Sequence, residues 1–426
     1  MTTTATIKRN FNIIVLRKLI IVSLIIGFLA GFLAIALKIA TDYFEHELFN
    51  KASQNWLYIL IFPLFALSMI WFLRQYLFKK KENKGIREIF ESTGSKVKNL
   101  PSYKIASHFV NGLLTVAFGG STGIEVSTVV ASAAIGSLAQ QKENIFRKYK
   151  SELICAGVAA GITALFGSPV AGILFAYEVI SRKLGRMFFL TNGLAVLAAS
   201  AVVYVLDDKP LFALNIPLWN LYALPWMVVL GILAGLNSVY LTKCVLEIKK
   251  HFGKIDRPFS RIILGAMIIS IALLAFPALY GDGYHALKEM FYQPTGIPLT
   301  LSLTGTLLGV LIFKPLITSV TLAAGGDGGV FAPSLFLGAF LGFLVAMVLN
   351  TFFNAAVIPV NFMVVGMAAM LSGSIHAPFT ALFLVCGLTG DYTLFFPILM
   401  ACLISKYVAR FVLPYSVYTA PVLLIK

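Results

Sequence analysis

The sequence has little charge and few of the residues that build metal or disulfide sites. Only 12% of its 426 residues are charged, whereas soluble domains carry about 25%. Its four cysteines and five histidines do not follow the spacing of a zinc site or a disulfide framework. The chain is 59% hydrophobic, with a mean hydropathy of +0.88. These values exclude an ordinary soluble domain and predict a polytopic membrane protein.

Acidic residues are scarce relative to basic ones, 18 against 34, and the formal net charge is +16. The basic residues fall between hydrophobic runs, which is the distribution that the positive-inside rule describes. A membrane is therefore a better partner than nucleic acid. One basic stretch, which predicts a cytoplasmic connection and a cytoplasmic N-terminus, comprises Arg74, Lys79, Lys80, Lys81, Lys84 and Arg87. The first apolar run is too long for the core of a signal peptide, so we expect no cleaved signal.

Apolar runs divide the chain into predicted membrane helices. Those long enough to cross the hydrocarbon core are Leu19–Ala40, Trp56–Phe78, Met187–Leu206, Tyr222–Leu246, Ile262–Tyr280, Leu299–Ile317, Val330–Phe353 and Leu394–Val412. Shorter segments are Gly85–Thr93, Ile105–Phe118, Val126–Leu138, Leu153–Phe166, Pro169–Ile180, Asn361–Ser372 and Phe379–Leu388. Broken helices at membrane depth are tolerated only where they are buried in protein or line a cavity, so we expect them to surround a transport path.

The two halves of the chain resemble each other. GGSTGIEVSTVVASAAIG from Gly119 parallels GGDGGVFAPSLFLGAFLG from Gly325, an offset of 206, and SPVAGILFAYEVIS from Ser168 parallels APFTALFLVCGLTG from Ala377, an offset of 209. Two nearly equal offsets predict an internal duplication, and interrupted segments at matching positions point to a transporter binding site. We expect one transmembrane domain over residues 1–426, with repeats at about 19–210 and about 215–426 and no soluble regulatory domain.

Glu125 is the only formally charged residue between positions 105 and 141. A carboxylate at membrane depth is costly, so it is a functional-site candidate by default. Three glycines lie in the six positions before it, and the predicted helix Val126–Leu138 follows. Free N–H groups and the positive end of the helix dipole favour anions at such a helix start, so the carboxylate can compete with a dissolved anion. The alternative is a loop acid at the membrane surface.

These motifs resemble those of the CLC family of chloride channels and proton/chloride antiporters, over about residues 19–418. Gly328–Pro333 (GGVFAP) matches the family signature G-G-[IV]-F-A-P in full. Gly123–Ser127 (GIEVS) keeps the glycine and the glutamate of G-[KR]-E-G-P, and Asn83–Glu88 (NKGIRE) is a weaker match to G-S-G-I-P-E. Ser416–Thr419 (SVYT) fits the pore tyrosine, and Ser168–Glu178 fits A-P-[LI]-[AG]-G-x-L-F-x-x-E.

The resemblance implies an all-α, multi-pass, CLC-like fold of two inverted repeats with re-entrant helices. It implies a homodimer with one pore per subunit in a bacterial inner membrane, with chloride or other small anions as ligands and no cofactor. Glu125 would be the gate. The residues implied to bind the anion are Lys84, Gly85, Ile86, Ile124, Val126, Val330, Phe331 and Tyr418.

Departures from the family pattern bear on the mechanism. Proton-coupled members carry a second acid directly after the position of Glu178, which the family uses structurally, and here that residue is Val179. This is the pattern of the family's channels, although some antiporters also lack the acid. We therefore expect passive conduction of chloride. Antiport through a non-standard proton route and a fluoride-selective relative are the alternatives, and the complete GGVFAP motif argues against the second. A membrane-embedded enzyme would need a nucleophile, metal cluster or acid pair that the sequence does not show.

Two further departures have opposite charge. Lys84 replaces the serine of the first motif, and Asp327 stands where an uncharged residue is usual. The resemblance places both at the central anion site, so we expect Lys84 to pair with Asp327, or alternately with Glu125, and to control the inner mouth. In the alternative interpretation, Lys84 extends to the cytoplasm with the rest of its basic stretch.

Overall fold

The computed structural model describes residues 2–78, 83–95, 97–181, 184–206, 209–292 and 299–420. Lys79, Lys80 and Lys81 of the predicted basic loop lie outside the described residues. The first half contains α1 (Thr2–Gln54), α2 (Trp56–Tyr76), α3 (Ile86–Gly94), α4 (Tyr103–Ala117), α5 (Glu125–Gln141), η1 (Asn144–Tyr149), α6 (Lys150–Phe166), α7 (Pro169–Phe175), η2 (Ala176–Ser181) and α8 (Arg186–Leu206).

The second half repeats this helical pattern. It contains η3 (Leu221–Ala223), α9 (Leu224–Gly253), α10 (Pro258–Ala275), η4 (Pro277–Leu279), α11 (Tyr284–Phe291), α12 (Leu301–Ala323), α13 (Phe331–Phe352), α14 (Pro359–Ile375), α15 (Pro378–Thr389) and α16 (Phe395–Val412). Within the described residues, nine helices are long and apolar enough to cross a membrane. The predicted all-α polytopic architecture is confirmed.

Several elements differ from the sequence-based expectation, and three of the differences have a clear cause or change the architecture. Helix α1 runs on to Gln54 instead of ending near Ala40. The predicted run Ile262–Tyr280 breaks after Ala275, because Pro277 lacks an N–H and disfavours a helical residue before it. Helix α11 was not predicted, since its eight residues include charged side chains and form no long apolar run.

The helix breaks occur at matching positions of the two halves. Helix α6 ends at Gly167 and helix α14 ends at His376, both in the left-handed conformation, with φ of 61° and 57°. The next helix then begins with a proline at its first position, Pro169 in α7 and Pro378 in α15. Proline fits the first helical turn, where its missing N–H is not needed. The offset of 209 seen in the sequence is thus an offset between two equivalent breaks.

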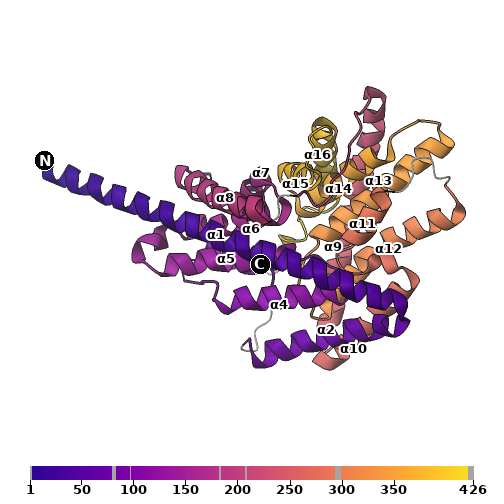
Figure 1. The fold of residues 1–426 in the computed structure, drawn as a ribbon, viewed down its shortest axis with the longest axis horizontal. Helices are drawn as coiled ribbons and strands as arrows, with labels where there is room; N and C mark the ends of the chain where they lie inside the picture. Colours follow the sequence, from indigo (N-terminus) through magenta and orange to yellow (C-terminus); the bar gives the residue numbers. More distant parts are fainter. Residues whose placement is uncertain are drawn as a thin grey trace.

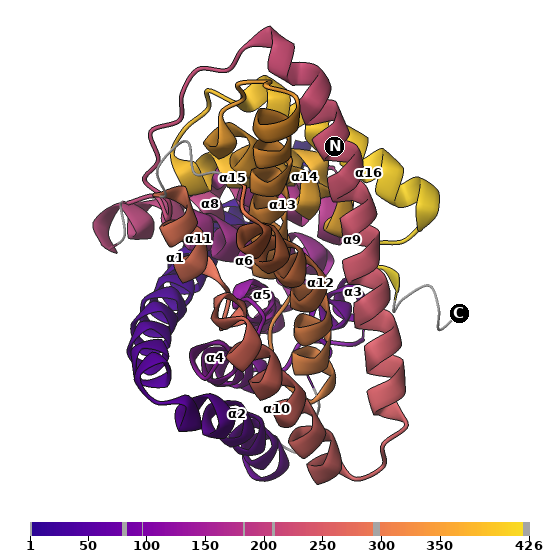
Figure 2. The same ribbon diagram turned by 90° about the vertical axis from the view of Figure 1, so that its right-hand side faces the viewer.

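The most buried helices lie at the centre of the molecule. Helix α5 packs on α6 in the first half, and α13 packs on α14 in the second. In Figure 2, α5, α6 and α13 lie inside a ring formed by α1, α2, α10 and α9. Figure 1 shows the same arrangement from the side, with α2 and α10 next to each other. The peripheral helices therefore shield a central region from lipid.

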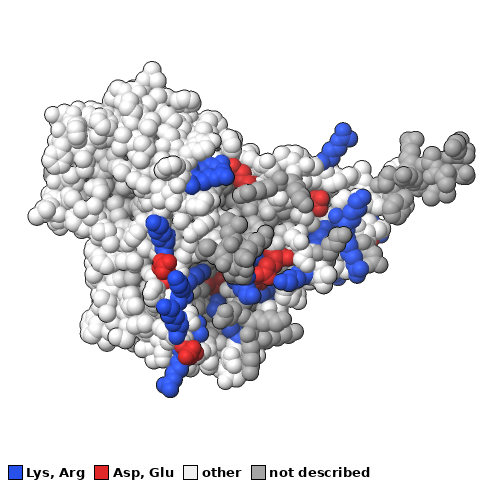
Figure 3. All heavy atoms as spheres, turned by 180° about the vertical axis from the view of Figure 1, so that it is seen from behind, with Lys and Arg blue, Asp and Glu red and all other residues white. Residues whose placement is uncertain are grey.

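Charged side chains are unevenly distributed over the surface. In Figure 3, Lys and Arg gather on the part of the face toward the N-terminal end, and the rest of that face is almost free of charge. Many apolar side chains on the peripheral helices are exposed, such as Phe28, Phe72 and Ile271. An extended uncharged, apolar surface is what contact with lipid requires.

Candidate functional site

The glycine-rich loops before α5 and α13 meet at the centre of the molecule. Gly123 and Gly329 exchange two backbone hydrogen bonds, with N···O distances of 3.3 and 3.0 Å. The hydroxyl of Thr122 also donates to the Gly329 carbonyl at 2.7 Å. Because each loop comes from a different half of the chain, these bonds fix the two halves against each other at this point.

Two more hydrogen bonds show the internal symmetry directly. The Ser121 N–H donates to the hydroxyl of Thr321 at 3.2 Å, and the Asp327 N–H donates to the hydroxyl of Thr115 at 2.9 Å. The two donors are 206 positions apart, and so are the two acceptors. The offset of the sequence repeat therefore recurs in reciprocal tertiary contacts.

Three helices begin around this meeting point without a side chain that caps them. The residues that precede α3, α5 and α13 are Gly85, Ile124 and Val330, and none of these three makes a side-chain capping hydrogen bond. The first N–H groups of such helices have no intrahelical acceptor, and they point toward a favourable place for an anion. The three starts come from distant parts of the sequence, as the motifs predict.

The Glu125 side chain is buried between the starts of α5 and α13, and its residue is only 1% exposed. Its Oε1 accepts a hydrogen bond of 2.9 Å from the Tyr284 hydroxyl, and its Oε2 has no hydrogen-bond partner in the described part of the chain. A Cβ atom on Gly123 would overlap this carboxylate and the side chain of Ala332. Glycine is therefore required where the carboxylate lies against the backbone.

A cavity of about 140 Å³ lies next to this site. Six of the eight residues that the resemblance implies for anion binding line it: Lys84, Gly85, Ile86, Val126, Val330 and Tyr418. The Tyr418 hydroxyl is buried and has no hydrogen-bond partner among the described residues. Phe331 stacks on the Tyr418 ring at a centroid distance of 6.2 Å, and Ile124 precedes Glu125 at the start of α5. These two residues support the cavity without lining it.

The cavity has several charges on its wall. Lys84, Arg87 and Lys249 contribute positive charge, and Asp327 contributes a carboxylate. Lys84 and Lys249 are exposed residues, whereas Asp327 is buried. Such charges raise the local concentration of anions at a mouth without binding one tightly.

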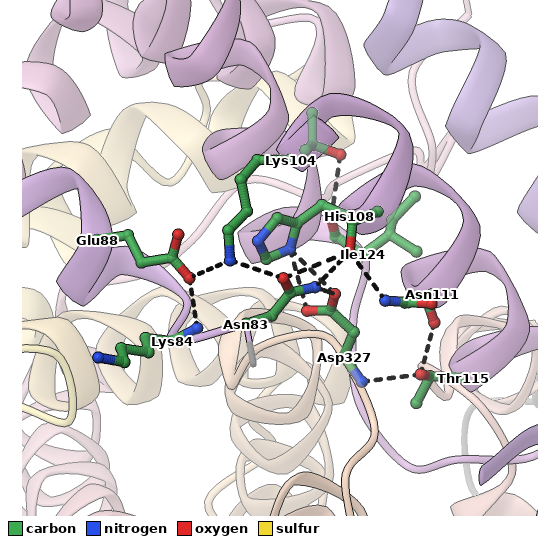
Figure 4. Close-up of polar contacts among 11 residues, drawn as sticks. Asn83, Lys84, Glu88, Lys104, His108, Asn111, Thr115, Ile124 and Asp327 are labelled. Carbon is green, nitrogen blue, oxygen red and sulfur yellow. Dashed lines mark hydrogen bonds and ion pairs between the residues drawn. The ribbon is translucent and has the colours of Figure 1, made fainter. Parts of the chain in front are cut away.

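Asp327 is the centre of a buried polar network, shown in Figure 4. Asn83 Nδ2 donates to its carboxylate at 2.5 Å, and His108 Nδ1 lies 3.1 Å from it. Lys84 points away, and its backbone N–H bonds Glu88 instead. The predicted Lys84–Asp327 pair is therefore wrong. The side chains of Asn83 and Lys84 point in opposite directions, so only Asn83 reaches Asp327.

Sequence reasoning also missed Lys104. It is nearly fully buried, and its ammonium lies 2.8 Å from the Glu88 carboxylate and 2.9 Å from the Asn83 amide oxygen. It thereby links α3 and α4 to the Asp327 network (Figure 4). The buried His108 ring contacts Asp327 through Nδ1, and its Nε2 has no hydrogen-bond partner among the described residues.

Glu178 and Val179 lie on the π-helical turn η2. Oε2 of Glu178 accepts the N–H and the hydroxyl of Thr380, both at 2.7 Å. It thus satisfies a free donor in the first turn of α15, which is a structural role. Val179 is buried and lines a second cavity of about 580 Å³, together with Lys406 and Arg410.

Comparison with known proteins identifies the family. A family model described as "Voltage gated chloride channel" matches residues 65–410. The chain belongs to this family. Members of this chloride channel and transporter family move anions across membranes and are not enzymes, so the chain is a multi-pass membrane protein of anion transport. No comparison distinguishes a channel from an antiporter.

The bacterial relatives cover most of the chain. A putative chloride channel protein, ClcB-like, of Ralstonia nicotianae is 28% identical over 361 residues, which are 81% of this chain and 80% of the relative. The voltage-gated ClC-type chloride channel ClcB of Escherichia coli is 28% identical over 341 residues, 77% of this chain and 76% of the relative.

Solved structures of the chloride channel family show the same fold. A slow cyanobacterial chloride/proton antiporter has a TM-score of 0.80 at 20% identity, over 96% of this chain and 98% of that one. A CLC-type fluoride/proton antiporter has a TM-score of 0.79 at 23% identity, over 94% and 96%. At these identities the likeness establishes the fold alone.

Proposed function

We propose that the protein conducts chloride passively through a pore that Glu125 gates. The buried Glu125 carboxylate, held between the starts of α5 and α13, is the observation that supports this proposal. When it is ionised, it occupies a place suited to an anion and blocks the path. Protonation removes the competing charge, and displacement of the side chain opens the same space.

The proposed chloride site uses dipoles and a hydroxyl instead of a dry positive charge. Uncapped N–H groups at the starts of α3, α5 and α13 supply the donors, together with the Tyr418 hydroxyl, which has no partner among the described residues. Conduction requires binding that is weak enough for release, and partial charges meet that requirement. The exposed cations Lys84 and Lys249 would attract anions to the cavity from outside.

Passive conduction rests on Val179 and Glu178. Val179 carries no titratable group, and Glu178 is occupied with the first turn of α15. Neither is then available to pass protons from the cavity of about 580 Å³. Antiport through another proton route and selectivity for fluoride are the competing functions, and flux measurements with chloride, fluoride and proton gradients separate all three.

We also propose the membrane arrangement and the assembly. The N-terminus would be cytoplasmic in a bacterial inner membrane, because basic side chains cluster toward that end (Figure 3) and cytoplasmic loops are enriched in Lys and Arg. The protein would be a homodimer with one pore per subunit, as the family resemblance implies. All three helix starts and Tyr418 come from one chain, which supports one anion site per subunit.

Chloride efflux from liposomes tests the gate. Glu125→Gln keeps the shape of the side chain and removes its charge, so chloride flux should rise at neutral pH and lose its increase at low external pH. Glu143→Gln is a matched control, because Glu143 pairs with Lys18 on α1 and neither residue lines the cavity next to Glu125. Chloride flux that keeps its wild-type pH dependence in Glu125→Gln would contradict the proposed gate.

A further inference from the structure

Glu125 has a hydrogen-bond partner that belongs to none of the pore motifs. The partner is Tyr284, the first residue of α11, whose hydroxyl donates to Glu125 Oε1 at 2.9 Å. Tyr284 lines a cavity of about 360 Å³, together with Glu45 and Asp282. The contact therefore reaches the gate from a different cavity than the one that Tyr418 lines.

The loop before Tyr284 is held rigidly from two directions. On one side, the ammonium of Lys314 donates to the carbonyls of Leu279 and Gly281 at 3.3 and 3.2 Å. On the other side, Glu45 Oε1 accepts the Asp282 N–H at 3.2 Å. The two side chains that hold the loop come from different long helices, Lys314 from α12 and Glu45 from α1. A loop fixed in this way can hold one side chain in a defined place.

The local backbone directs Tyr284 toward the gate. Gly283 has a φ of 88°, and a Cβ there would overlap the ring of Phe336, so only glycine fits. The Asp282 carboxylate accepts the Tyr284 N–H at 2.8 Å, which caps the start of α11. The Tyr284 ring packs edge-on against Phe212 at a centroid distance of 5.7 Å. Backbone and ring are thus both fixed, and the hydroxyl is left to bond Glu125.

A buried cation, Lys314, lies near the acidic residues Asp282 and Glu45 at this loop. Lys314 is fully buried, and its ammonium lies 4.6 Å from the centre of the Phe336 ring. Its positive charge acts on both Asp282 and Glu45. Buried charges persist only when they are paired and hydrogen-bonded. Lys314 therefore supports the loop that carries Tyr284 through its two carbonyl contacts.

We propose that Tyr284 is a positioning residue of the gate, whose hydroxyl holds the ionised Glu125 carboxylate in the blocking position. This inference rests on the proposed function of Glu125. A hydrogen bond to an ionised group favours the ionised, bound form, so breaking it makes opening easier. Tyr284 then sets how readily the gate opens, and Glu125 remains the group that blocks.

The test compares two tyrosines in the same region. Tyr284→Phe removes the hydroxyl and keeps the ring packing. Tyr280→Phe is the matched control, because the Tyr280 hydroxyl donates to the Ala117 carbonyl at 2.9 Å and does not bond Glu125. We expect Tyr284→Phe to raise chloride flux at neutral pH, since a hydrogen bond to a charged group shifts an equilibrium by about tenfold or more. Tyr280→Phe should not raise it.

The pH profile gives a second readout. Without the hydroxyl, the carboxylate of Glu125 loses a stabilising partner, so half-activation should move to higher pH by about one unit. The other charged groups around Tyr284 are Asp282 on its own loop, Glu45 and Asp42 on α1, and Lys314 on α12. They are unchanged in both tyrosine variants, so a shift confined to Tyr284→Phe reports the lost hydroxyl.

A combined variant separates positioning from any other role of Tyr284. In a Glu125→Ala background there is no carboxylate to hold, so adding Tyr284→Phe should leave chloride flux unchanged. An additional change there would overturn the inference, and so would a Tyr284→Phe protein that behaves like Tyr280→Phe. A Glu125→Gln protein with wild-type flux and pH dependence would instead contradict the proposed function. Tyr284→Leu serves as a second variant if Tyr284→Phe does not reconstitute.

Discussion

The contacts of Asp327 predict how much its carboxylate stabilises the fold and which neighbouring side chains are energetically coupled to it. Asp327→Ser would remove an acceptor that is only 4% exposed and leave Asn83 Nδ2 and His108 Nδ1 without it. Each hydrogen bond to a charged group contributes about 1.5–3 kcal/mol. We therefore expect Asp327→Ser to lower the free energy of unfolding by about 3–5 kcal/mol. Thr115 still accepts the backbone N–H at this position, so the loop keeps its anchor.

Double-mutant cycles measure the coupling free energy between Asp327 and each of its neighbours. The cost of Asp327→Ser should be smaller when His108→Leu is already present, with a coupling of about 1.5–3 kcal/mol. Lys84→Ser should add to Asp327→Ser within about 0.5 kcal/mol, because Lys84 is exposed and points away from Asp327 (Figure 4). The measurement is reversible unfolding of the purified protein in mixed detergent micelles. A Lys84–Asp327 coupling as large as that of His108 would refute this reasoning.

Two other residues allow shorter tests. Lys314→Met would leave buried acids without a nearby cation, so it should lower the free energy of unfolding by about 3–5 kcal/mol and with it the melting temperature. Lys288 is exposed, so Lys288→Met should change the melting temperature little. Equal melting temperatures of the two variants would contradict the role of the buried Lys314. Burial raises the pKa of Asp327, but the nearby His108 ring and other neighbouring groups together have a larger opposite effect, so the pKa of Asp327 lies below its ordinary value. The stabilisation is then complete above about pH 4 and is lost as pH falls through the lowered pKa. Asp327→Asn should remove this acid-sensitive part of the unfolding free energy, and an unchanged acid dependence would count against it.

Local patterns predicted the helices and the meeting of the motifs. The repeat offset of 206 anticipated the reciprocal bonds of Thr115 and Thr321, because equivalent loops of a duplicated chain adopt equivalent conformations. The glycine-rich stretches before Glu125 and Val330 are visible in the sequence, and the loops that they form exchange backbone hydrogen bonds. These features depend on short stretches whose chemistry is visible in the sequence.

Contacts between distant segments could not be predicted in the same way. Tyr284 lies in no motif, and its bond to Glu125 exists only because α11, which contacts α13, brings its first residue to the gate. Lys84 and Asn83 are neighbours, and no sequence pattern decides which of them faces Asp327. Lys314 is different, because it is the only charge in its apolar run. The cost of charge at membrane depth would have marked it as a candidate.

Proton movement under a chloride gradient is the most direct test of passive conduction through the Glu125 gate. The purified protein would be reconstituted into liposomes, first with a chloride gradient and no proton gradient and then with an opposed pH gradient, and both ions would be followed. We predict chloride flux without proton uptake, and a reversal potential that follows the chloride gradient and ignores an opposed pH gradient. Protons driven uphill by chloride with a fixed stoichiometry, and no longer driven in Glu125→Gln, would contradict passive conduction.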